Sequence, residues 1–61
     1  YRRSVYVSED IAAGETFGAH NLKIVRPAFG LAPKHWDSVI GKKATVALAK
    51  GTALAWEHVS S

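Results

Sequence analysis

The sequence predicts a small, mostly β domain that contains short helical turns. The chain has 61 residues and is 48% hydrophobic, a composition typical of one packed globular domain. Short segments rich in β-forming residues are separated by glycine and proline, which favour turns. A pattern of apolar residues around a turn glycine also occurs twice at a spacing of 37 positions, as Ile11 and Leu48 show (48 − 11 = 37).

Two segments have the composition of β-strands. Residues 4–7 are rich in β-formers, and residues 22–25 alternate apolar and polar side chains, so one face of this second strand is expected to be buried. Pro27 ends the second strand, because proline has no N–H to donate to a neighbouring strand. Residues 19–22 are expected to form one helical turn, and residues 44–48 a further extended stretch.

A short helix is expected between Pro33 and Gly41. Proline suits the first helical position, and glycine suits the position just beyond the last one. Within this segment Trp36, Val39 and Ile40 have the spacing i, i+3, i+4. This spacing places the three side chains in one apolar stripe, which we expect to face the core.

The repeated pattern predicts two similar halves. Residues 11–17 (IAAGETF) resemble residues 48–54 (LAKGTAL), and Gly14 of the first copy matches Gly51 of the second. In each copy, an apolar residue, a spacer, a turn glycine and a second apolar residue are followed by a short helical turn. Two copies are too few for a solenoid. We therefore expect two half-clips that face each other around a pseudo-two-fold axis.

Composition and spacing argue against several classes of function. The chain has no cysteine, which excludes disulfides and thiolate metal sites, and His20, His35 and His58 lack the spacing of metal ligands. We expect no metal site and no catalytic residue in this chain. The eight Lys and Arg exceed the five Asp and Glu by only three and are dispersed, so we expect no nucleic-acid partner. No apolar run approaches the length of about 20 residues that a membrane helix needs.

An ordered set of motifs extends over nearly the whole chain. It comprises residues 3–7, Asp10-Ile11, Gly14-Glu15, Asn21-Leu22, Arg26-Pro27, Gly30-Leu31, Pro33-Lys34, residues 40–44, residues 50–52, Leu54 and Trp56. This set resembles the C-terminal antifreeze-like domain, also called the SAF or β-clip domain, of bacterial sialic acid synthases. That family includes the N-acetylneuraminate, legionaminate and pseudaminate synthases. The resemblance implies a β-clip pretzel fold, with residues 1–3 at the end of an interdomain linker and residues 4–61 as the SAF domain of a larger two-domain enzyme.

The resemblance also implies an activity for that larger enzyme. An N-terminal (β/α)8 barrel would condense phosphoenolpyruvate with an N-acylated amino sugar and release phosphate. A divalent metal, manganese or magnesium, is expected in the barrel, and no cofactor is expected in this chain. In a cytoplasmic, domain-swapped homodimer, this domain would cap the barrel of the partner subunit. The domain alone is not expected to catalyse the reaction.

Arg26 is the candidate substrate-binding residue. The resemblance implies that the arginine of the Arg-Pro pair reaches the partner's site and contacts the sugar near its N-acyl group. Independently, a guanidinium is planar, permanently charged and rich in N–H donors, which suits the carbonyl, hydroxyl or carboxylate oxygens of a polar ligand. Pro27, Phe29, Gly30 and Lys34 are candidate residues for supporting the loop or an interface.

The chain departs from the family pattern at position 28. The family usually has glycine after the Arg-Pro pair, where this chain has Ala28, and alanine would be strained at a positive φ. The run of residues 29–34 favours the pseudaminate or legionaminate branch of the family.

Two functions remain as alternatives to the synthase. One alternative is a β-clip module of another protein, such as a sugar-acid dehydratase or a pilus-assembly protein. The other is an ice-binding protein, although Glu15 and His20 would oppose an ordered ice-like water layer.

Overall fold

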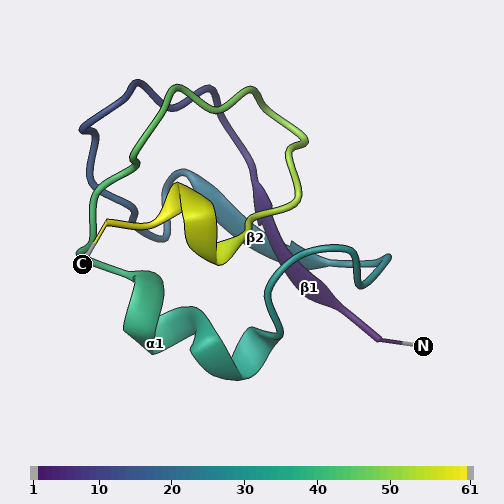
Figure 1. The fold of residues 1–61 in the computed structure, drawn as a ribbon. Coiled ribbons are helices and arrows are strands. Elements are labelled where there is room, and N and C mark those ends of the chain that lie inside the picture. The colour runs from purple at the N-terminus through teal and green to yellow at the C-terminus, as the bar shows by residue number, and fades with distance from the viewer. Residues whose placement is uncertain (1, 61) are drawn as a thin grey trace.

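One two-stranded antiparallel sheet forms the centre of the molecule. The computed structural model describes residues 2–60, and within them β1 (Ser4–Val7) pairs with β2 (Leu22–Val25). Ser4 lies opposite Val25, and Val7 lies opposite Leu22. Both strands have the predicted bounds, and Figure 1 shows them crossing near the middle of the view.

The structure describes most of the predicted linker and most of the predicted domain. Tyr1, the first residue of the predicted linker, and Ser61, the last residue of the predicted domain, lie outside the described residues. The sheet begins at Ser4, the predicted first residue of the domain, and Arg2 and Arg3 precede it as exposed residues.

The predicted helix after Pro33 is confirmed. It consists of a 3₁₀ turn, η1 (Pro33–His35), followed by one turn of α-helix, α1 (Trp36–Val39). Gly41 follows with a φ of +91°, a conformation that favours glycine. Val39 is fully buried, and Trp36 and Ile40 pack against the core, so the predicted apolar stripe does face inward.

The remaining chain is less regular than a mostly β fold. The helical turn predicted over residues 19–22 is wrong, because residues 19–21 form a turn and Leu22 already belongs to β2. Residues 44–48 contribute isolated bridges at their two ends rather than a strand. A 3₁₀ turn, η2 (Trp56–His58), follows. The described fold is therefore a small sheet joined by single bridges and short helical turns.

Within residues 2–60, nine buried apolar residues form one core between these elements. They are Val5, Val7, Ile11, Phe17, Leu22, Val39, Ala44, Leu48 and Leu54. Phe17 is the largest of the fully buried side chains. Because these residues come from segments distributed over most of the chain, the core holds together segments that are far apart in sequence.

Main-chain hydrogen bonds join the segments around the two turn glycines. Ile11 and Leu48 donate to each other's carbonyl oxygens at 2.8 Å in both directions. Figure 1 shows these two segments, dark blue and green, running along the same side of the molecule. Other main-chain hydrogen bonds occur in pairs. Within each pair the two donors are 37 positions apart in sequence, and so are the two acceptors. These are Gly14 N to Ala44 O (2.7 Å) with Gly51 N to Val7 O (2.8 Å), and Phe17 N to Lys42 O (2.8 Å) with Leu54 N to Val5 O (3.0 Å).

Candidate functional site

The candidate site is the loop of residues 26–31, which follows β2 and leads to η1. Arg26 comes directly after the last residue of the strand, and its peptide bond to Pro27 is cis. Arg26, Pro27 and Ala28 are exposed, and Phe29 has 80% of its surface accessible to solvent. In Figure 1 this loop projects beyond the end of the sheet. The loop therefore contains a solvent-exposed cationic residue and a solvent-exposed aromatic residue.

Ser4 connects the two ends of this loop to β1. Its hydroxyl donates to the carbonyl oxygen of Pro27 and accepts the N–H of Gly30, both at 3.0 Å. Ser4 is completely buried although its side chain is polar. These two bonds explain the burial, because a buried hydroxyl is tolerated when it is hydrogen-bonded.

Gly30 lies against β1 with no room for a side chain. A Cβ atom at this position would lie 2.5 Å from the carbonyl oxygen of Val5 and 3.0 Å from the nitrogen of Leu54. The next residue, Leu31, accepts a hydrogen bond from Val5 N and donates one to Leu54 O, both at 2.9 Å. Glycine is required here because the main chains approach closely, and not for a positive φ.

Ala28 is compatible with the shape of the loop. Among the described residues, no residue other than glycine has a positive φ. Ala28 therefore avoids the backbone strain that a left-handed turn at this position would impose. The glycine that the sequence pattern lacks at position 28 is not needed for the loop to form as observed.

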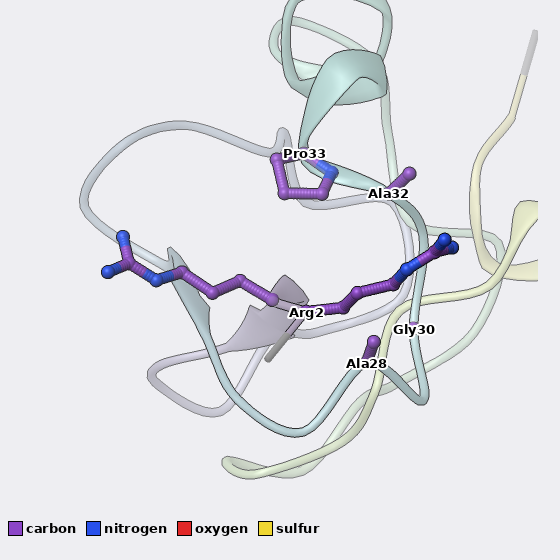
Figure 2. A pocket seen from close by; sticks show the side chains of 6 residues that line it. Arg2, Ala28, Gly30, Ala32 and Pro33 are labelled. Atoms are coloured by element: carbon purple, nitrogen blue, oxygen red, sulfur yellow. The ribbon is translucent and has the colours of Figure 1, made fainter.

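A shallow hollow of about 340 Å³ lies beside the loop. Its lining consists of Arg2, Arg3, Ala28, Gly30, Ala32 and Pro33. Figure 2 shows Arg2 between the labelled residues Ala28 and Pro33. Neither arginine is among the site residues predicted from the sequence, because the family resemblance places residues 1–3 in a linker. The useful signal was their position directly before the strand that anchors the loop.

Lys34 lies apart from these residues. It is exposed within η1 and does not line the hollow. Its neighbour His35 makes an edge-to-face contact with Trp56, with ring centroids 5.1 Å apart and ring planes at 68°. The structure therefore groups Arg26, Pro27, Phe29 and Gly30 in one loop and places Lys34 on the adjacent helical turn.

The described residues do not contain a cluster that fits a metal ion. Nowhere in residues 2–60 do three or more His, Cys, Asp or Glu side chains gather in a way that could hold one. In the same residues, no helix has the length and apolar character that crossing a membrane requires. What the loop can offer chemically is recognition, through a guanidinium and the aromatic ring of Phe29.

The model of the SAF domain family matches residues 2–60, which is nearly the entire chain. The chain belongs to the SAF domain family. Among its relatives, this SAF domain is 48% identical over 54 residues to a pseudaminic acid synthase of Campylobacter jejuni. It is also 32% identical over 60 residues to an N,N'-diacetyllegionaminic acid synthase of Legionella pneumophila, and 36% identical over 59 residues to a pseudaminic acid synthase of Helicobacter pylori.

Each of these alignments covers most of the SAF domain but little of the relative. The alignments cover 88%, 98% and 97% of this chain, and 16%, 17% and 17% of the respective synthases. The relatives fit a SAF domain of the sialic acid synthase type, as the sequence motifs predict.

Solved structures show the same fold. The spore coat polysaccharide biosynthesis protein of Bacillus subtilis superposes with a TM-score of 0.85 over 97% of this chain and 18% of its own, at 22% identity. A putative spore coat polysaccharide biosynthesis protein E of Chromobacterium violaceum gives a TM-score of 0.84 over 98% of this chain and 18% of its own, also at 22% identity. At this identity the comparison shows the fold alone.

Proposed function

We propose that this SAF domain caps the active site of a nonulosonic acid synthase and supplies Arg26 to bind the amino sugar. The similarity to pseudaminic and legionaminic acid synthases supports the class of enzyme. The observation that carries the role of Arg26 is its place at the start of an exposed loop whose two ends are fixed to β1. A loop fixed in this way can hold a binding group in one position.

The chemistry of Arg26 suits an N-acylated sugar. Its guanidinium can donate several hydrogen bonds in one plane to an acyl carbonyl and to neighbouring hydroxyls. Arg26 orients the sugar in this proposal and takes no part in proton transfer.

The proposal places the chemistry in a barrel domain outside this chain. There, phosphoenolpyruvate and the amino sugar would condense with release of phosphate, with manganese or magnesium bound in the barrel. The described residues of this chain lack a group of ligands that could hold the metal, so no metal ligand is assigned to them. This domain would cap the barrel of the partner subunit in a domain-swapped homodimer. The enzyme would act in the cytoplasm, where phosphoenolpyruvate is formed.

Within the proposed complex, Phe29 is the candidate contact with the partner's barrel. A phenylalanine with 80% of its surface exposed leaves apolar area in water, and burial against another surface would remove that cost. Lys34 is a second candidate for the same interface, since it is exposed on the helical turn that follows the loop.

We also propose that the fold is a β-clip pretzel with an internal pseudo-two-fold axis between Ile11 and Leu48. The paired hydrogen bonds support this, because their donors and their acceptors are both related by 37 positions. Side-chain bonds follow the same spacing: Gly18 N donates to Asn21 Oδ1 at 2.9 Å, and Ala55 N donates to His58 Nδ1 at 3.0 Å.

Steady-state kinetics of the full-length protein tests the role of Arg26. Arg26→Ala should raise the KM for the amino sugar at least about tenfold and leave the KM for phosphoenolpyruvate unchanged, because only the sugar loses a contact. Lys23→Ala is the matched control, since Lys23 is an exposed cation on β2 and its removal changes the charge equally. An unchanged sugar KM in Arg26→Ala would overturn the proposal.

A further inference from the structure

Ser4 occupies an unusual position at the base of the candidate loop. It pairs with Val25 across the sheet, and Arg26 is the next residue along the chain. Its hydroxyl reaches Pro27 O and Gly30 N, which are 23 and 26 positions away in sequence. One completely buried side chain therefore lies next to the point where the loop leaves the sheet and to the point where it returns.

The hydroxyl takes the place of a direct bond within the loop. Pro27 O and Gly30 N are three residues apart, the spacing at which a carbonyl and an amide bond directly to each other in a β-turn. Here each bonds to the hydroxyl of Ser4 at 3.0 Å. One oxygen atom of β1 therefore bridges these two groups of the loop.

The loop cannot easily relax onto the sheet if this atom is removed. Gly30 already lies so close to Val5 O that a Cβ would sit 2.5 Å away, and Leu31 is bonded to Val5 and Leu54. The returning end of the loop is therefore fixed by main-chain contacts. The outgoing end, which bears Arg26 and Pro27, is held through the carbonyl of Pro27 by Ser4.

From this geometry we infer that Ser4 is a positioning residue for Arg26, and that its hydroxyl sets where the guanidinium meets the amino sugar. This inference rests on the proposed function of Arg26 and extends it to a residue that never touches the substrate. Without the hydroxyl, Pro27 O and Gly30 N lose their shared partner and the outgoing end of the loop can shift. A shift of about 1 Å in a positioning group can cost up to about a hundredfold in rate.

Steady-state kinetics of the full-length protein with four variants tests the inference. In Ser4→Ala we expect the KM for the amino sugar to rise about tenfold, with the KM for phosphoenolpyruvate unchanged. In an Arg26→Ala background, adding Ser4→Ala should change the sugar KM less than twofold, because Ser4 acts only through Arg26. Asn21→Ala is the control. Asn21 is also a buried polar residue that bonds two main-chain groups, Gly18 N and Thr16 O, but it lies outside the loop.

The outcomes separate the two proposals. If Arg26→Ala leaves the sugar KM unchanged, the proposed function fails. If Arg26→Ala raises it and Ser4→Ala does not, only the inference about Ser4 fails. The inference about Ser4 also fails if Ser4→Ala raises the sugar KM by the same factor with and without Arg26, or if Asn21→Ala raises it as much as Ser4→Ala does. Either result would show that Ser4 has a general structural role.

If the protein carrying Ser4→Ala does not fold, Ser4→Cys is used instead, because a thiol is close in size to a hydroxyl and is only a weak hydrogen-bonding group. The same increase in sugar KM and the same dependence on Arg26 are expected.

Discussion

The main chains of Ile11 and Leu48 bond to each other in both directions at 2.8 Å, and both side chains are buried in the core. Each residue is thus both a hydrogen-bonding partner and a packing partner of a residue 37 positions away. Residues at this contact should be sensitive to small losses of volume, because the surrounding main chain cannot move independently.

Ile11→Val should lower the free energy of unfolding by about 1 kcal/mol, the usual cost of removing one buried methyl group. Ile24→Val makes the same chemical change on β2, where the side chain is only partly buried, and should cost less. Thermal or denaturant unfolding of the protein carrying each variant measures the difference. An equal cost at the two positions would contradict the assignment of Ile11 to the core.

Gly51→Ala should lower the free energy of unfolding by about 1 kcal/mol through backbone strain. The φ of Gly51 is +93°, but nothing lies within 4 Å of a Cβ placed there, so a clash cannot account for the loss. Gly51→Asn should be less destabilising, because asparagine tolerates a positive φ better than alanine does. The two unfolding midpoints test this order, and Asn proving the worse substitute would argue against backbone strain.

Asp10→Ala should cost about 1 kcal/mol, because Asp10 Oδ1 accepts the N–H of Lys50 at 2.8 Å across 40 positions of sequence. Asp10→Asn keeps an oxygen acceptor in the same place and should retain most of this stability. Comparing the unfolding free energies of both variants separates the hydrogen bond from the charge. If Asp10→Asn is as unstable as Asp10→Ala, the negative charge and not the bond matters.

Phe29→Ala should leave the free energy of unfolding within about 0.5 kcal/mol, since the side chain is 80% exposed. In the full-length protein the same variant should weaken the association of subunits, if Phe29 docks on the partner's barrel as proposed. Sedimentation analysis of the full-length protein as a function of concentration measures this. Val46→Ala, at a second exposed apolar residue, is the control and should leave the association unchanged.

Local patterns in the sequence were sufficient to predict the two strands and the helical segment after Pro33. The first strand could be predicted from its run of β-formers, and the second from its alternating side chains and from Pro27, which follows it. The helical segment could be predicted from Pro33, Gly41 and the spacing of three apolar residues. Residues 19–21 were assigned wrongly to a helix, because a four-residue window carries too little information to distinguish a helical turn from a turn that leads into a strand.

The candidate site could be predicted only in part. Arg26 and its loop follow from a motif, but the partners of Ser4 are 23 and 26 positions away and leave no local signal. A serine in a β-forming segment would ordinarily be expected on the exposed face of the strand. The need for glycine at position 30 was likewise hidden, because it arises from the carbonyl of Val5.

The crossing of hydrogen bonds between the two halves also determines how the domain opens. The amides of Ile11, Gly14 and Phe17 bond to carbonyl oxygens of residues 42–48. The amides of Leu48, Gly51 and Leu54 bond to carbonyl oxygens of residues 5–11. Detaching either half thus breaks the bonds of the other, and no intermediate with one intact half is expected. The protected amide protons of both halves should therefore exchange with solvent through one common, global opening event.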